Sequence, residues 1–491
     1  MLFNSYGFIF IYLPIVLIGF FHLARISHAF AAGWLALASL FFYGYWNPAY
    51  LGLLSGSIIC NYSFGLWIAK AGVKHDAARQ KRLLIVAISA NLLLLAYYKY
   101  ANFFLGNLNT VASTHFSLGE IILPLGISFF TFTQIAFLVD TYQGKVKEYN
   151  FIHYSLFVTY FPHLIAGPIL HHKEMMPQFA HAGTYRINWE HIASGLLLFT
   201  LGLCKKTLWA DALAPYANGV FDGVQHGAIP SIYEAWAGAL AYTLQIYFDF
   251  SGYTDMALGV ALLFNIHLPI NFDSPYRATS IIEFWRRWHM TLSRFLRDYL
   301  YIPLGGNRKG TQRRYANLMA TMLLGGLWHG AGWTFVCWGA LHGIYLTANH
   351  LWREYFPEKP ARWLPAWLSG LSGGALTFVA VVAAWVVFRA NNIVQAGVML
   401  KAMFGLEALP ISFAEVTRGQ LLLTTDLSGR DLVKLLVFAL AWVWLLPNST
   451  RLKFIQGSFV LALAQAVAVV FFLYLVLDQF GSYSPFLYFQ F

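Results

Sequence analysis

A histidine lies within an apolar run of glycines and tryptophans at residues 325–333, GGLWHGAGW. This residue, His329, is ionisable, and an ionisable side chain at membrane depth raises the free energy unless it is paired, hydrated or used in chemistry. Histidine also changes charge near neutral pH, so its imidazole can accept and return a proton during a reaction. His329 is therefore either a reactive centre or a core histidine whose hydrogen bonds are satisfied.

A second histidine, His289, lies in the run 283–300, EFWRRWHMTLSRFLRDYL. Apolar residues recur in this run in steps of three and four, which predicts one amphipathic helix. The members of this stripe are Trp285, Trp288, Leu292, Phe295 and Tyr299. The helix is too charged to cross a bilayer, and its simplest role is an anchor at the membrane interface. That role does not account for His289, which we place between the stripe and the charged face, where its imidazole could reach a cavity.

Acidic and hydroxyl side chains gather in a third apolar stretch, as Asp249, Ser251, Tyr253 and Asp255. Unpaired carboxylates at membrane depth are disfavoured, so both aspartates need partners. The arginines between residues 286 and 297 are the nearest candidates. The aspartates either tie helices together through ion pairs and caps, or act directly, for example by orienting a histidine.

The composition predicts an integral membrane protein. Hydrophobic residues make up 58% of the 491 residues and charged residues only 11%, against about 25% charged residues in soluble domains. Long apolar runs favour helices over a barrel. No hydrophilic block is longer than a loop, so we predict one all-α polytopic domain over residues 1–491. The three cysteines are scattered without metal-ligand spacing, so no metal site and no disulfide framework are predicted.

Apolar segments alternate with short polar stretches along the whole chain. Several are too short or too interrupted to cross roughly 30 Å of hydrocarbon alone, so some are expected to be broken, re-entrant or interfacial. We predict about eleven tilted transmembrane helices with re-entrant and interfacial pieces. The segments run over about 6–24, 30–46, 50–70, 82–105, 119–140, 151–171, 188–210, 232–264, 316–349, 370–389, 432–447 and 457–479.

The net charge of +11 indicates contact with anionic membrane lipid in basic cytoplasmic loops, and no nucleic-acid partner. One such loop covers residues 74–82, and the densest basic cluster covers 286–314. The pair Lys205 and Lys206 is interpreted as the end of a helix. The more polar segments at 211–230 and 405–430 are expected to be outward-facing loops.

A glycine-rich loop at 304–310, LGGNRKG, follows the second histidine. It lacks the spacing of a nucleotide-binding P-loop. Its residues Asn307, Arg308 and Lys309, together with Arg286 and Arg287, could still receive the phosphates of a cytoplasmic donor such as a coenzyme A thioester.

Four runs of residues together resemble the membrane-bound O-acyltransferase family: GGLWHGAG at 325–332, FWRRWH at 284–289, YFDFSGY at 247–253 and PHLIAGP at 162–168. The opening MLFNS, the run PLGISF at 124–129 and the closing PFLYFQF also fit, so the resemblance spans nearly the whole chain. Within the family, the chain is most similar to the bacterial branch that contains the membrane subunit for alginate O-acetylation.

The resemblance implies a ring of tilted helices around a tunnel that crosses the membrane, with a catalytic core at about 120–350. It implies that His329 is the catalytic general base, and that His289 is the second catalytic position, which holds the acceptor or stabilises the developing oxyanion. Trp328 and Trp333 would wall the tunnel, and Gly330 and Gly332 would let backbones approach closely.

The resemblance also implies a substrate and a partner. The donor would be acetyl-coenzyme A or another acyl thioester, with no tightly bound cofactor. The acceptor would be an exported polysaccharide such as alginate or cellulose, reached from the bacterial inner membrane through a separate periplasmic acetyltransferase.

Three other functions stay open at this point. Relatives that acetylate peptidoglycan share these motifs, so the polymer is not fixed by them. The chain could instead be a polysaccharide channel or flippase with the two histidines as lining or proton-relay groups. It could also be a scaffold whose partner carries out all of the chemistry.

Overall fold

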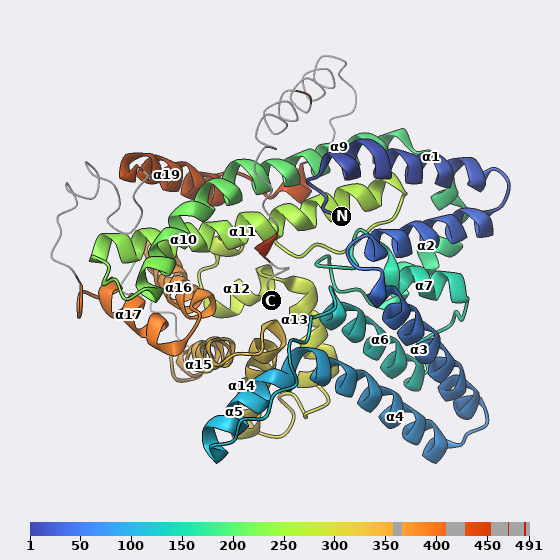
Figure 1. The fold of residues 1–491 in the computed structure, drawn as a ribbon, viewed down its shortest axis with the longest axis horizontal. Coiled ribbons are helices and arrows are strands. Elements are labelled where there is room, and N and C mark those ends of the chain that lie inside the picture. Colours follow the sequence, from blue (N-terminus) through green and yellow to red (C-terminus); the bar gives the residue numbers. More distant parts are fainter. Residues whose placement is uncertain (357–365, 409–427, 453–469, 471–485, 488–491) are drawn as a thin grey trace. The chain divides into compact units, whose positions relative to one another are not determined.

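The structure is a computed structural model that describes residues 1–356, 366–408, 428–452, Val470, Phe486 and Leu487. Its elements are helical, as predicted from the composition (Figure 1). The chain contacts group into two compact units. Unit 1 comprises Met1–Leu203, Tyr253–Ile270 and Lys453–Phe489, and unit 2 comprises Cys204–Gly252, Asn271–Leu452 and Gln490–Phe491. The organisation of residues 1–491 as one domain stays a prediction.

Unit 1 contains the helices of the first two hundred residues and the second part of α11. Within it α1 and α2 form a hairpin, and α3 and α4 form another (Figure 1). Its elements are η1 (Gly7–Tyr12), α1 (Leu13–Ala24), α2 (His28–Gly44), α3 (Ala49–Val73), α4 (Ala77–Leu95), η2 (Ala96–Tyr100), α5 (Ala101–Ala112), α6 (Ile127–Tyr142), α7 (Phe151–Thr159), α8 (His172–Ala180), η3 (Ala182–Tyr185) and α9 (Trp189–Cys204).

The predicted segment 151–171 is broken, and Pro162 and Pro168 lie at the break. Helix α7 ends at Thr159, and a buried turn follows through residues 161–167. Gly126, which has a φ of +70°, packs against this turn so closely that a Cβ would lie 2.9 Å from the Leu164 carbonyl oxygen. A buried irregular backbone of this kind is tolerated at membrane depth only when protein covers it.

Unit 2 contains both histidines singled out from the sequence. Helix α11 (Ile232–Leu263) begins in unit 2 and continues into unit 1. The other elements of unit 2 are η4 (Lys205–Ala210), α10 (Asp211–Gln225), η5 (Pro275–Arg277), α12 (Ile281–Arg287), α13 (Met290–Leu296), η6 (Arg297–Tyr301), α14 (Thr311–His329), α15 (Trp333–Tyr355), α16 (Ala366–Arg389), α17 (Ile393–Met403), α19 (Gly429–Leu445) and η8 (Ser449–Arg451).

The run Lys205–Lys206 does not mark a helix end. Both lysines are buried in the π-helical segment η4, which joins α9 to α10 in one helical stretch from Trp189 to Gln225. The expectation of an outward loop at 211–230 was therefore wrong for the part that forms α10. Most of the other expected loop, 405–430, lies outside the described residues.

The apolar segment 316–349 forms two antiparallel helices, α14 and α15, rather than one. They pack with their backbones in contact, because a Cβ on Gly326 would lie 2.2 Å from the Phe335 carbonyl oxygen and one on Gly339 would lie 2.4 Å from the Met322 carbonyl oxygen. Small residues permit this close approach in membrane helices. Gly326 and Gly339 thus have the role that we had expected of Gly330 and Gly332.

Five helical stretches in the described part of the chain are long and apolar enough to cross a membrane. They support a multi-pass membrane protein, and the predicted number of about eleven is not confirmed. The apolar segment 457–479 lies almost wholly outside the described residues. The five stretches are Gly7–Ala24, Ala49–Val73, Ala77–Ala112, Trp189–Gln225 and Leu368–Arg389.

We predict that Gly326→Ala destabilises the α14–α15 hairpin, because its methyl group would overlap the Phe335 carbonyl. Overpacking of this kind lowers the free energy of unfolding by about 1–3 kcal/mol. Thermal denaturation of the purified protein in detergent measures the effect. Gly332→Ala is the matched control, since its nearest neighbour would lie at 3.4 Å. Equal melting temperatures for the two variants would contradict the close backbone packing.

Candidate functional site

His329 is the last residue of α14, and its imidazole is enclosed by aromatic rings. The ring of Trp328 lies 4.9 Å away between centroids, that of Trp338 5.1 Å and that of Phe388 5.4 Å, each at 71–85° to the imidazole. These rings come from α14, α15 and α16. Only 7% of the His329 surface is exposed. The site is therefore a nearly dry aromatic enclosure, in which an electrostatic interaction is stronger than in water.

His289 breaks the amphipathic helix that we predicted over 283–300. Helix α12 ends at Arg287 and α13 begins at Met290, with His289 between them at φ +42° and ψ +53°. This left-handed conformation is uncommon for a residue with a side chain and costs on the order of 1–3 kcal/mol. Strain of this size persists only where neighbouring structure imposes it.

The loop at residues 271–273 imposes the break. The Met290 amide donates to the Asn271 carbonyl over 3.0 Å, and the Asp273 amide donates to the Arg287 carbonyl over 3.0 Å. The hydroxyl of Thr291 also donates to the Asn271 side-chain oxygen over 2.5 Å. Backbone groups on both sides of His289 are thus bonded to one loop, which fixes where the imidazole lies.

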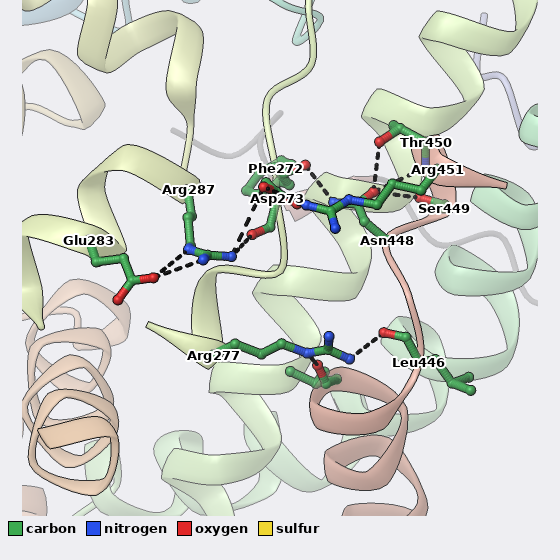
Figure 2. Close-up of polar contacts among 11 residues, drawn as sticks. Phe272, Asp273, Arg277, Glu283, Arg287, Leu446, Asn448, Ser449, Thr450 and Arg451 are labelled. Atoms are coloured by element: carbon green, nitrogen blue, oxygen red, sulfur yellow. Dashed lines mark hydrogen bonds and ion pairs between the residues drawn. The ribbon is translucent and has the colours of Figure 1, made fainter. Parts of the chain in front are cut away.

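Charged side chains brace the same loop, as Figure 2 shows. The Arg287 guanidinium donates to Glu283 over 2.8 and 3.0 Å and to the Asp273 carbonyl over 3.1 Å. Arg451 donates to both carboxylate oxygens of Asp273 over 3.0 and 3.1 Å. Arg277 donates to the carbonyls of Val443 and Leu446 at the end of α19. The predicted donor-binding residue Arg287 is therefore engaged in holding the segment that carries His289.

The two catalytic candidates share one neighbour, Trp328. The His289 ring lies 6.2 Å from the Trp328 ring, and the His329 ring lies 4.9 Å from it. The centroids of the two imidazole rings are therefore no farther apart than the sum of these two distances. On its other side His289 meets the Phe250 ring at 4.8 Å, at an angle of 85°. Residues forty positions apart in the chain thus lie within one aromatic cluster of unit 2.

A third histidine, His342, belongs to this cluster and was not singled out from the sequence. Its ring lies 4.8 Å from that of Trp338, which itself contacts His329. The indole N–H of Trp285 donates to its Nδ1 atom over 3.2 Å. The signal in the sequence was the four-residue spacing of Trp338 and His342, which places both on one face of α15.

The aspartate Asp249 on α11 pairs with a lysine, whereas we had expected the arginines of residues 286–297. Its carboxylate accepts from the Lys206 ammonium over 2.8 Å, and Lys206 also donates to Asp211 over 2.8 Å. The side chains of Lys206 and Asp249 are each only 2% exposed. The pair ties the helical stretch that contains η4 to α11, which supports the structural interpretation of Asp249.

The other predicted support residues are divided between the two units. Ser251 is buried in unit 2, whereas Tyr253 and Asp255 are buried in unit 1. Within unit 1, Tyr253 stacks on Phe3 with 5.0 Å between the ring centroids and meets Phe486 at 4.8 Å. These contacts give Tyr253 a packing role.

The remaining predicted residues lie at the surface of unit 2. Trp333, expected to wall a tunnel, is 57% exposed at the start of α15, while Trp328 is buried. The donor-side residues Arg286, Asn307, Arg308 and Lys309 are exposed. Their side chains are accessible to an anionic ligand.

A separate cavity of about 580 Å³ lies in unit 2, among η5, α16 and α19. Its walls are mainly apolar and include Tyr276, Phe378 and Trp444, with Arg277 beside them. Neither of the imidazoles of His289 and His329 lines it. Among the residues that the structure describes, no group of three or more His, Cys, Asp or Glu side chains could hold a metal ion.

Comparison with known proteins gives a consistent set of relatives. The model of the membrane-bound O-acyltransferase family matches residues 40–388. A peptidoglycan O-acetyltransferase of Helicobacter pylori is 43% identical over 92% of this chain and 90% of its own length. A protein of Pseudomonas putida named "probable alginate O-acetylase" is 40% identical over the full length of both chains. A teichoic acid D-alanyltransferase of Bacillus subtilis is 28% identical over 49% of this chain and 62% of its own length.

We predict that the backbone conformation at His289 distinguishes two substitutions of similar size. Asparagine tolerates the left-handed region, whereas a β-branched valine is strongly disfavoured there. His289→Val is expected to have a free energy of unfolding about 1–3 kcal/mol below that of His289→Asn. Thermal melting of the two purified variants measures the difference, and equal stability would show that the left-handed conformation is not maintained.

We predict that Asp249→Asn destabilises the protein by about 1.5–3 kcal/mol, since the buried Lys206 ammonium loses one charged hydrogen bond and keeps Asp211 as its charged partner. Asp211→Asn is the matched control and should cost less, because the Asp211 side chain is 19% exposed. Thermal melting compares the two. Acyl transfer per folded molecule should be retained in Asp249→Asn, and its loss would favour the direct role for this carboxylate.

Proposed function

The chain belongs to the membrane-bound O-acyltransferase family, and we propose that this O-acyltransferase moves an acetyl group from a cytoplasmic thioester to an exported cell-envelope polysaccharide, with His329 as the general base. The observation that supports this proposal is the aromatic enclosure of His329, with His289 beside the same Trp328 ring.

The chemistry of transfer requires little more than alignment and removal of one proton. A thioester is already activated toward attack by a hydroxyl group, and correct positioning lowers the barrier by several kcal/mol. As the hydroxyl oxygen bonds to the acyl carbon, its proton must leave. We propose that a nitrogen of His329 takes this proton and passes it to the departing thiolate, which contributes on the order of 10²–10⁴-fold to the rate.

His289 would assist as a neutral imidazole. Helices α12 and α13 contain seven residues each and are too short to cross a bilayer. Burial lowers the pKa of His289 to about 3, so its ring is uncharged at neutral pH. A neutral imidazole retains one N–H donor, which could stabilise the oxyanion that develops on the thioester carbonyl in a water-poor site.

The donor would approach from the basic surface formed by Arg286, Asn307, Arg308 and Lys309. These side chains are exposed and lie in the region that the positive-inside rule assigns to the cytoplasm. Guanidinium groups bind phosphate oxygens in pairs of hydrogen bonds, which suits acetyl-coenzyme A or another phosphorylated acyl thioester. We propose no tightly bound cofactor, because the donor itself supplies the activated group.

The acceptor is proposed to be a polysaccharide such as alginate or cellulose, modified with the help of a periplasmic acetyltransferase. This places the protein in the bacterial inner membrane, in contact with anionic lipid on the cytoplasmic side. The full-length similarity to the Pseudomonas putida protein supports this choice.

Peptidoglycan is a second candidate acceptor, and the 43% identity to the Helicobacter pylori protein supports it. The two candidates differ in which polymer loses acetyl groups. Mass spectrometry of the exported polysaccharide and of the peptidoglycan from a deletion strain separates them.

We predict that His329→Ala lowers acyl transfer by at least about 10²-fold, because the general base is lost. The readout is acetate on the cell-envelope polymer of a strain that lacks the native protein and expresses the variant at the native level. His226→Ala is the matched control, because His226 is exposed at the end of α10. Undiminished acetylation by His329→Ala would rule out the catalytic role and favour a scaffold or channel.

A further inference from the structure

The imidazole of His342 carries a buried N–H whose position is fixed by its neighbours. The indole N–H of Trp285 is a donor only, and it donates to Nδ1 of His342 over 3.2 Å. An imidazole nitrogen that accepts a hydrogen bond carries no proton, so the proton of the neutral ring is on Nε2. The tautomer of His342 therefore follows from the identity of its partner.

The Nε2 atom of His342 has no hydrogen-bond partner among the described residues, although the residue is fully buried. An unsatisfied buried donor is destabilising, and such groups are rare in folded proteins. Four of the rings around His342, those of Phe284, Trp285, Trp338 and Trp385, carry no oxygen. The fifth, Tyr345, lies 5.7 Å away between ring centroids, and its hydroxyl accepts no hydrogen bond from Nε2. An oxygen-bearing ligand would satisfy this donor.

The position of His342 along the α14–α15 hairpin indicates which substrate would bring that oxygen. The start of α14 is joined to the end of α15, because Glu354 accepts from Arg314 and from the Tyr315 hydroxyl, each over 3.0 Å. Arg308 and Lys309 of the basic surface directly precede α14 in the chain, so this surface lies at the same end of the hairpin. His342 lies one helical turn closer to it than Trp338, whose ring contacts His329. A donor that enters past the basic surface would meet His342 before it reaches His329.

We propose that His342 binds the acyl donor, with its Nε2–H donating a hydrogen bond to a carbonyl oxygen of the thioester substrate. The proposal rests on the function proposed above, and it assigns the donor half of the site to α15. The contact holds the donor in the ground state and moves no proton. Trp285, which fixes the tautomer of His342, acts as a positioning residue.

Equilibrium binding of acetyl-coenzyme A to the full-length protein in detergent tests the proposal. All variants are made in a His329→Ala background, so that no turnover occurs. His342→Phe keeps an aromatic ring without the N–H, and its Kd is expected to rise about three- to tenfold, the equivalent of one hydrogen bond. His342→Gln retains an N–H donor and should bind within about twofold of the parent.

Two further variants separate binding from a purely structural role. Trp285→Phe leaves the His342 ring in place but no longer fixes its tautomer, so its Kd should rise by less than that of His342→Phe. His226→Phe is the matched control and should leave the Kd unchanged. If His342→Phe does not fold, the comparison of His342→Gln with His342→Ala, which lacks the donor, gives the same answer.

The failures of the two proposals are distinguishable. If the parent binds acetyl-coenzyme A and loss of the His342 N–H lowers only the melting temperature, His342 merely anchors Trp285 and the inference is overturned. If the parent does not bind acetyl-coenzyme A, the donor proposed for the protein is wrong and this inference falls with it.

Discussion

The backbone of unit 2 depends on one constraint, the bonding of residues 271–273 across the break between α12 and α13. The Arg287 carbonyl before His289 and the Met290 amide after it are both hydrogen-bonded to this loop, which holds His289 in a left-handed conformation that an isolated chain would leave. The ion pairs of Arg287 with Glu283 and of Arg451 with Asp273 brace the same loop. An exposed ion pair on its own contributes little to the free energy of unfolding. Here they act on a segment whose position decides where an imidazole lies, so their effect is on geometry more than on stability.

Local signals in the sequence were sufficient where the chemistry is local. The run GGLWHGAG singled out His329, and in the structure three aromatic rings enclose this residue. The apolar helices were also predicted, because long apolar runs act through nearest neighbours. The role of His329 as a base stays a proposal.

Nonlocal contacts explain what the sequence left undetected. The run 283–300 contains no glycine or proline that would interrupt its helical periodicity, so the break at His289 was not predictable. The break arises from hydrogen bonds to the loop at residues 271–273, which lies outside this run. The lysines of η4 suggested a helix end because their charges were visible, whereas their partners, Ser449 for Lys205 and Asp249 for Lys206, lie far along the chain and were not recognised. His342 was missed for the same reason, since its relation to His329 depends on how α14 and α15 pack through Gly326 and Gly339.

The aromatic rings around His329 have a physical consequence for its proposed role. When a histidine acts as a general base it becomes an imidazolium cation, and a low-polarity site normally disfavours that charge. The nearly perpendicular arrangement with Trp328, Trp338 and Phe388 allows an N–H edge to meet a ring face, and such cation–π contacts contribute about 0.5–2 kcal/mol. Because a ring attracts the cation without being titratable, the enclosure can exclude water and still stabilise the charged intermediate. This reconciles a dry site with a base that must acquire a proton.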